Sequence, residues 1–382
     1  MAARILGPDQ ISQAANMLRA GKLVAFPTDT VYGVASIPTA WAEQEPANLA
    51  GQEIELGHDP DSVYLRKFKG GRRELFSLHC GSVQGALTFT SPRTHAEVRV
   101  LQALAPTGVT VVVRWHSRSL GVRVVQHPLG SAFLEACEVP ALATSANLHG
   151  QPPLNDPAAI AQLPGLDAVL DGGVLPARPA STVVRLLPAG LQVLRRGAVD
   201  DDALARAFTR DLQFVCLGNL NRSAFAAGLV AAMQQWLAQR VAGFVPAWRV
   251  RSCGIIANPQ AKVPPEMLSA ALLHGVDLSG HVPTRFAGGG PADELDIAMG
   301  DDAAAAVETV AQGEVANLHV PDPMGGPPAA YQAAAQAITM RLHFEVMHEW
   351  APQPAKEGPG RDQADAELES EFRRKFLAGA RS

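Results

Sequence analysis

Residues 214–223 read Phe-Val-Cys-Leu-Gly-Asn-Leu-Asn-Arg-Ser, and this stretch decides the fold of the second half of the chain. Residues 212–216, Leu-Gln-Phe-Val-Cys, predict a strand, and the alanine-rich residues 223–241 predict a long helix. Further helices are expected at 264–274 and 327–349, and a strand at 294–299. Strands that alternate with helices indicate a doubly wound parallel sheet that is covered on both faces.

The loop after the first strand has the composition of a phosphate-binding loop. Five residues separate Cys216 from Arg222, and over this length backbone N–H groups can surround one phosphate, helped by the positive end of the following helix. Arg222 can hold two phosphate oxygens, and the same field favours the thiolate of Cys216. Gly218 is expected to allow the turn, and the Ser223 hydroxyl is expected to hydrogen-bond the sulfur. The predicted phosphate-binding residues are Leu217, Gly218, Asn219, Leu220, Asn221 and Ser223.

A cysteine placed in this way before an arginine is, by itself, more typical of a buried structural thiol near a surface arginine. The flanking strand and helix favour phosphate chemistry, and the longer string resembles the signature of low-molecular-weight protein-tyrosine phosphatases. Three further segments match that family in order, at residues 273–281, 294–302 and 320–323.

This resemblance implies a hydrolase in which Cys216 attacks a phosphomonoester, Arg222 holds the phosphate and Asp322 is the general acid. Asp322 would protonate the leaving oxygen and then activate water against the phosphocysteine; without the resemblance, it would simply cap a turn. The implied substrate is a phosphorylated protein. Phosphotyrosine is preferred, and phosphoarginine is the alternative, because Leu220 stands where arginine phosphatases carry threonine. No metal or cofactor is required.

Two residues depart from the pattern of this family. Asn221 stands at the position of a second cysteine, so the disulfide that often protects the nucleophile cannot form there. Met324 follows the Asp-Pro pair at a position that is often aromatic. The edge of the substrate pocket is therefore expected to differ from that of the family.

The first half of the chain is rich in predicted strands, among them 22–26, 108–113, 121–125 and 181–186. The string Pro-Thr-Asp-Thr-Val-Tyr-Gly at 27–33 follows the first of them. It resembles the opening signature of the YrdC-like, threonylcarbamoyl-AMP synthase family. More matches follow in order, at residues 77–79, 121–124, 127–128, 143–147, 181–184 and 194–197.

The second resemblance implies an α/β domain with a twisted mixed sheet that condenses threonine, bicarbonate and ATP into threonylcarbamoyl-AMP for the modification of tRNA. Magnesium is expected to accompany ATP as part of the substrate. The implied threonine-binding residues are Thr30, His79, Arg123 and Ser181. The implied ATP-binding residues are Lys67, Lys69, Arg72, Ser145, Asn147 and Arg195.

Residues 66–76 keep an alternative open. Their Lys/Arg spacing departs from the family pattern, and they directly follow an acidic, Pro- and Ala-rich insertion at 37–62. The first domain could therefore be a non-catalytic module that binds nucleotide or RNA, including double-stranded RNA, and directs the phosphatase.

Composition sets the remaining expectations. The formal net charge of −5 argues against a surface that coats nucleic acid, and no apolar run is long enough to span a membrane. The four cysteines are far apart, so neither a disulfide framework nor a zinc site is expected, and a cytoplasmic location is favoured. The expected organisation is a YrdC-like domain at 1–199, a linker at 200–210, a phosphatase domain at 211–351 and a charged, flexible tail at 352–382. Within this tail, residues 362–378 could form a charged helix.

Overall fold

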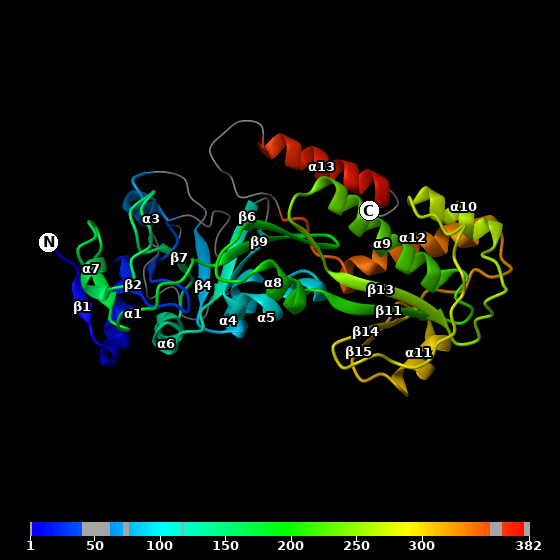
Figure 1. Ribbon diagram of the computed structural model, residues 1–382, viewed down its shortest axis with the longest axis horizontal. Coiled ribbons are helices and arrows are strands. Elements are labelled where there is room, and N and C mark those ends of the chain that lie inside the picture. Colours follow the sequence, from blue (N-terminus) through cyan, green and yellow to red (C-terminus); the bar gives the residue numbers. More distant parts are fainter. Residues whose placement is uncertain (1, 40–61, 72–75, 116–117, 352–360, 378–382) are drawn as a thin grey trace.

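The computed structural model describes residues 2–39, 62–71, 76–115, 118–351 and 361–377. Most of the predicted insertion at 37–62 lies outside the described residues, and so does Arg72, one of the predicted ATP-binding residues. The chain forms two α/β units side by side, the first from its amino-terminal half and the second from its carboxyl-terminal half (Figure 1).

The first unit is built on sheet A, a mixed sheet in which the described residues form eleven strands in the order β1-β8-β2-β3-β7-β4-β6-β5-β9-β10-β12. Its strands are β1 (Arg4–Leu6), β2 (Val24–Phe26), β3 (Gly33–Ser36), β4 (Ser77–Cys80), β5 (Val109–Trp115), β6 (Arg118–Val124), β7 (Ala141–Ser145), β8 (Ala168–Leu170), β9 (Thr182–Leu187), β10 (Gly190–Arg195) and β12 (Phe244–Pro246). The pairing is parallel between β4 and β6 and antiparallel between β3 and β7. This confirms the mixed sheet predicted for the first domain.

Helices of the first unit pack around this sheet. They are α1 (Ile11–Arg19), α3 (Val63–Phe68), α4 (Val83–Thr90), α5 (His95–Leu104), α6 (Pro128–Cys137) and α7 (Pro157–Ile160), with 3₁₀ turns at Pro8–Gln10 and Ala105–Thr107. Several begin at a side chain that caps the first turn: Ser62, Ser82 and Thr94 each accept a hydrogen bond from a backbone N–H three residues later.

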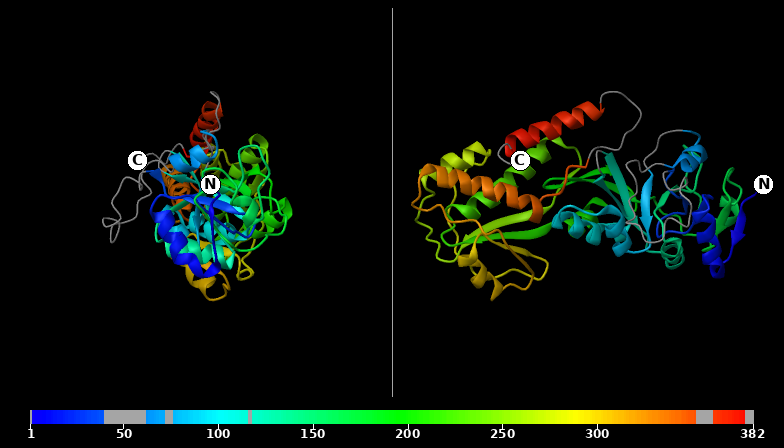
Figure 2. Two further views of the ribbon diagram at one scale, coloured as in Figure 1. Left: turned by 90° about the vertical axis from the view of Figure 1, so that its left-hand side faces the viewer. Right: turned by 180° about the vertical axis from the view of Figure 1, so that it is seen from behind.

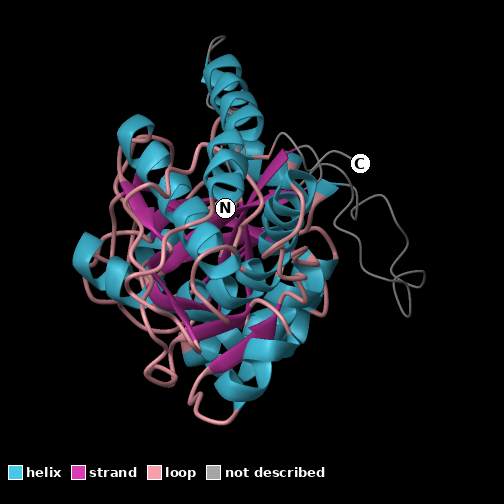
Figure 3. Ribbon diagram, turned by 90° about the vertical axis from the view of Figure 1, so that its right-hand side faces the viewer, coloured by secondary structure: helices cyan, strands magenta, loops and turns pink. Residues whose placement is uncertain are grey.

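The second unit is built on sheet B, a parallel sheet with the order β13-β11-β14-β15. Its strands are β11 (Arg210–Cys216), β13 (Trp248–Gly254), β14 (Leu295–Ala298) and β15 (Glu314–Asn317). The helices α9 (Arg222–Arg240), α10 (Pro265–Leu273) and α12 (Pro328–Glu345) lie on one face, and α11 (Asp301–Glu308) lies on the other (Figures 1 and 3). The predicted doubly wound parallel sheet is therefore confirmed.

The two units share a sheet. Strand β12 follows α9 in the second unit, yet it pairs antiparallel with β10 and extends sheet A. Backbone hydrogen bonds from His348 to Pro188 (3.0 Å) and from Ala351 to Leu186 (3.1 Å) tie the end of the second unit to the same region. The residues between the units form α8 (Asp201–Phe208), which packs against α5. The linker is thus a helix on the core of the first unit.

Residues 361–377, which the sequence places in a flexible tail, contain α13 (Arg361–Phe376), a helix that lies across both units (Figures 1 and 2). Asp365 forms a buried ion pair with Arg185 of β9 (2.6 Å), and Glu369 pairs with Arg114 of β5 (2.9 Å). These contacts connect α13 to the first unit.

The contacts of α13 with the second unit are aromatic. Phe372 and Phe376 are completely buried, and both rings contact Trp236 of α9. Phe372 also packs against Trp350. Successive spacings of four residues align Leu368, Phe372 and Phe376 on one side of the helix. This narrow apolar stripe explains how so charged a segment binds the protein surface.

Candidate active sites

Cys216 is the last residue of β11, and its sulfur contacts polar groups of the loop that follows and of α9. The side chain is buried, Sγ lies 2.9 Å from Ser223 Oγ, and the backbone N–H of Asn219 donates to Sγ (3.2 Å). Because α9 begins at Arg222 directly after the loop, its free N–H groups and its positive end lie at the same place.

Asn219 holds the loop in shape. It adopts a left-handed backbone conformation (φ 54°), and its side-chain amide donates to Ser223 Oγ and Ser252 Oγ, both at 2.9 Å. Its Oδ1 accepts the N–H of Thr284 (2.8 Å). The sequence predicted that Gly218 would allow the turn of this loop, but the left-handed residue is Asn219. Asparagine tolerates this conformation when its side chain is locally hydrogen-bonded. A Cβ at Gly218 would meet only ordinary contacts.

Arg222 joins the loop to two carboxylates, Asp302 on α11 and Asp322 in the segment after β15. Its Nη2 donates to Asp322 Oδ2 (2.7 Å) and to Asp302 Oδ2 (2.8 Å), and its Nη1 donates to the carbonyl of Val320 (3.0 Å). Burial by itself lowers the pKa of Arg222, but the hydrogen bond to Asp302 and the charges of Asp322, Asp302 and Cys216 outweigh it and raise that pKa. The predicted trio of Cys216, Arg222 and Asp322 is thus brought together in one place.

Asp302 was not predicted from the sequence. It follows the carboxyl end of β14 by a few residues. The carboxyl ends of neighbouring parallel strands meet at one edge of a sheet, so the position of Asp302 just after a predicted strand was a signal that could have identified it. Gly300 makes the contact possible, since a Cβ there would lie 2.8 Å from Arg222 Nη1. Asn221, at the position of the missing second cysteine, instead donates from Nδ2 to Asp322 Oδ1 (3.3 Å).

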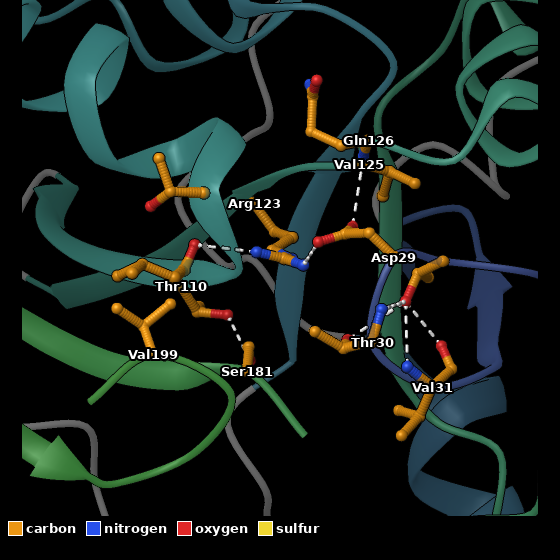
Figure 4. A network of polar contacts seen from close by, with 12 residues as sticks. Asp29, Thr30, Val31, Thr110, Arg123, Val125, Gln126, Ser181 and Val199 are labelled. Carbon is orange, nitrogen blue, oxygen red and sulfur yellow. Dashed lines mark hydrogen bonds and ion pairs between the residues drawn. The ribbon is translucent and has the colours of Figure 1, made fainter. Parts of the chain in front are cut away.

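Three of the predicted threonine-binding residues, Thr30, Arg123 and Ser181, lie around one ion pair in the first unit (Figure 4). Arg123 of β6 is only 1% exposed, and its Nη2 donates to Asp29 Oδ2 (2.6 Å). Asp29 Oδ1 accepts the N–H of Gln126 (3.1 Å). Burial lowers the pKa of Arg123, and the charge of Asp29 counters part of that effect. Asp29 was missed, although it lies inside the 27–33 motif next to Thr30.

Hydroxyl groups surround this ion pair. Thr30 Oγ1 lies 3.1 Å from Thr28 Oγ1, and Thr28 Oγ1 accepts the N–H of Thr30. Across the site, Ser181 Oγ lies 2.8 Å from Thr110 Oγ1 (Figure 4). Arg195 of β10 donates to the carbonyl of Ser181 (2.9 Å), so this predicted ATP ligand lies beside the hydroxyl cluster.

His79 lies next to Arg123, because the two residues are register partners on β4 and β6. Its Nδ1 is 3.0 Å from the carbonyl of Ser77, and its ring meets the edge of Phe26. Burial lowers the pKa of His79 to about 4. The imidazole is therefore neutral at physiological pH, and Nδ1 donates to the carbonyl.

The other predicted ATP-binding residues divide into two groups. Lys69 is buried, and its Nζ donates to the carbonyls of Ser145 (3.1 Å) and Asn147 (2.9 Å) and to Asn147 Oδ1 (2.8 Å). Lys67 is exposed on the last turn of α3. The structure therefore brings Lys69, Ser145 and Asn147 together, but not Lys67.

Two kinds of feature are absent from the described ranges. None of the helices in these ranges has the length and apolar character of a membrane span. The same residues contain no group of three or more His, Cys, Asp or Glu side chains suited to a metal ion.

Comparison with known proteins gives two family matches. The Sua5/yciO/yrdC family model, described as telomere recombination, matches residues 60–197, and the low molecular weight phosphotyrosine protein phosphatase model matches residues 211–347. A threonylcarbamoyl-AMP synthase of Xanthomonas campestris is 31% identical over 174 residues, which are 44% of this chain and 87% of that protein. A putative threonylcarbamoyl-AMP synthase of Mycobacterium leprae is 33% identical over 208 residues, 50% of this chain and 86% of that protein.

Among solved structures, the low molecular weight protein tyrosine phosphatase from T. tengcongensis is 20% identical and covers 34% of this chain and 92% of its own, with a TM-score of 0.29. The chain thus belongs to the threonylcarbamoyl-AMP synthase (Sua5/yciO/yrdC) family through its first half, to which a low-molecular-weight phosphotyrosine protein phosphatase domain is fused.

Proposed function

We propose that the second domain hydrolyses phosphomonoesters, with protein phosphotyrosine as the substrate class, through a phosphocysteine formed on Cys216. The observation that supports this most directly is the ion pair between Arg222 and Asp322 (2.7 Å). It places a carboxylate, from a segment 100 residues away in sequence, beside the loop that holds the sulfur.

A buried donor at this site supports phosphate as the ligand. Within the part of the chain that the structure describes, Nε of Arg222 is buried and has no hydrogen-bond partner. An unpaired buried donor is costly, and a phosphate oxygen above the loop would satisfy it. Arg222 can bind a phosphate while it keeps Asp302, because its guanidinium has five N–H donors.

The reaction follows in two steps. In the first, Sγ of Cys216 attacks phosphorus, the bond from phosphorus to the ester oxygen breaks, and Asp322 gives its proton to that oxygen. In the second, Asp322 takes a proton from water as the water oxygen attacks phosphorus and the bond from sulfur to phosphorus breaks. The Asn219 N–H and the Ser223 hydroxyl then stabilise the departing thiolate, since both contact the sulfur.

Hydrolysis of p-nitrophenyl phosphate tests this proposal. Cys216→Ser should abolish turnover, and Asp322→Ala should slow it by about 10²–10⁴-fold. Cys253→Ser is the matched control, because Cys253 is also buried but lies on the opposite face of sheet B, against α11. Undiminished turnover by the Cys216→Ser variant would refute the proposal.

We also propose that the first domain forms threonylcarbamoyl-AMP from threonine, bicarbonate and Mg²⁺-ATP, for use in tRNA modification. The identity of 31–33% to threonylcarbamoyl-AMP synthases supports it. So does the cluster around Arg123, whose planar guanidinium suits the carboxylate of threonine. That carboxylate would have to share the guanidinium with Asp29, which is already 2.6 Å away.

Release of pyrophosphate from ATP tests this activity. It should require both threonine and bicarbonate, and Arg123→Ala should abolish it, whereas Arg196→Ala should not. Arg196 is the matched control because it is exposed and pairs with Asp201. Binding of ATP without release of pyrophosphate would instead favour a non-catalytic module that binds nucleotide or RNA.

A further inference from the structure

Asp301, the first residue of α11, contacts two residues of the chain that leads to Asp322. Its Oδ1 accepts a hydrogen bond from Asn317 Nδ2 (2.8 Å) and lies 2.9 Å from His319 Nδ1. Asn317 is the last residue of β15, and His319 lies between this strand and Asp322. None of these three residues forms part of the reaction described above.

The segment between β15 and Asp322 is held from several sides. The backbone N–H groups of Leu318 and Val320 donate to the carbonyls of Ala298 (2.9 Å) and Met299 (2.8 Å). The carbonyl of Val320 accepts from Arg222. Any displacement of this segment therefore reaches both the arginine and Asp322.

His319 lies at a strained point of the same segment. Its φ of 46° is left-handed, a conformation that costs free energy for a residue other than glycine. Two contacts hold it there: its N–H donates to Asn317 Oδ1 (2.9 Å), and its ring meets Asp301. Asp301 therefore contacts both His319, the strained residue, and Asn317, whose side chain accepts the His319 N–H.

We propose that Asp301 is a positioning residue for the general acid, an inference that rests on the phosphatase function proposed above. It fixes Asn317 and His319, and through them the backbone that carries Asp322. The neighbouring Asp302 orients Arg222, so two adjacent carboxylates at the start of α11 position the two charged groups of the reaction.

If Asp301 only stabilised the fold, its loss would affect stability and not the dependence of the rate on the leaving group. The side chains of Asp301 and His319 are 85% and 62% exposed, and a polar contact so open to solvent contributes little to folding stability. An acidic residue in the first turn of a helix also stabilises that helix slightly. Either role would change the melting temperature a little but would not change how the rate depends on the leaving group.

The test compares two aryl phosphates. General-acid catalysis matters most when the departing phenolate is basic, so misplacement of Asp322 should slow phenyl phosphate more than p-nitrophenyl phosphate. Asp301→Ala should lower kcat for phenyl phosphate by about 10-fold and for p-nitrophenyl phosphate by less than about 3-fold, a fraction of the full general-acid effect. Asp301→Asn keeps an oxygen for Asn317 and should recover most of the rate.

Two further variants complete the experiment. His319→Ala should reproduce the selective loss, and the double variant with Asp301→Ala should be no slower than either single one, because the two residues act through one contact. Glu308→Ala, at an exposed position in the last turn of the same helix, should leave both rates unchanged.

Equal loss on both substrates, or no loss on either, by a folded Asp301→Ala variant overturns this inference while the unmodified chain stays active. Absence of turnover by the unmodified chain would overturn the proposed phosphatase function itself, and this inference with it.

Discussion

Gly254, the last residue of β13, allows the phosphate-binding loop to lie directly against the sheet. Its φ is not left-handed, so alanine would meet no backbone penalty there. A Cβ at this position would instead lie 2.6 Å from both the nitrogen of Asn219 and the carbonyl oxygen of Leu217, and 2.8 Å from the carbonyl carbon of Gly218. All three are backbone atoms of the loop, so no side chain can rotate away to make room.

The size of the effect of Gly254→Ala follows from these distances. Ordinary contacts of a Cβ begin at 3.4 Å, so the loop and the strand must separate by the difference from 2.6 Å, about 0.8 Å. A misplacement of about 1 Å in a catalytic site can cost about 10²-fold in rate. We therefore expect Gly254→Ala to lower kcat/KM for p-nitrophenyl phosphate by about 10- to 10²-fold, and to destabilise the domain by about 1–3 kcal/mol through overpacking.

Steady-state kinetics and a thermal melt of the same preparation measure the two effects. Gly280→Ala is the matched control, since a Cβ at that glycine would meet nothing within 4 Å. It should behave like the unmodified chain in both assays. A Gly254→Ala variant whose kcat/KM lies within twofold of the control would refute the view that contact with this strand sets the geometry of the loop.

Two other predictions concern buried arginines. Asp302→Ala should raise the inhibition constant of inorganic phosphate about 10-fold, since a hydrogen bond to a charged group is worth about 1.5–3 kcal/mol and Arg222 would lose one of its two carboxylates; an unchanged constant would contradict this. Asp365→Ala should destabilise the chain by about 3–5 kcal/mol, because it leaves Arg185 buried without its ion-pair partner, 2.6 Å away. A denaturant titration would detect that loss, and Glu367→Ala, exposed on the same helix, should change the stability by no more than about 0.5 kcal/mol.

The loop around Cys216 could be predicted from the sequence because its chemistry is local. Strand, turn and helix follow one another within a few residues, and Arg222 closes the loop. The contact of Arg222 with Asp302 could not be predicted in the same way. It depends on how closely Gly300 approaches Arg222, and that approach is set only when the sheet is assembled.

The first domain shows where pattern alone is insufficient. Lys67 and Lys69 were predicted to act together, but residues two apart near a helix end point in different directions, and only Lys69 is buried beside Asn147. The pairing of Arg123 with Asp29 joins strand β6 to the loop after β2, far away in sequence. The roles of these residues in threonine and ATP binding remain predictions.

The packing of helix α13 was hidden by its composition. Charged residues dominate it, and the average over the segment conceals Phe372 and Phe376, which are four residues apart and completely buried. Their partners lie on α9 and near the end of the second unit, and no local pattern reveals them.

The pairing of β12 with β10 has a consequence for how the chain is made. Because β12 spans Phe244–Pro246, the last strand of the first sheet leaves the ribosome only after the catalytic loop and α9 of the second domain. Until then β10 has an open edge, the kind of surface at which nascent chains associate with one another. Gene fragments cut between the two domains, near residue 199, would keep that edge open, so the first domain is best expressed together with the second.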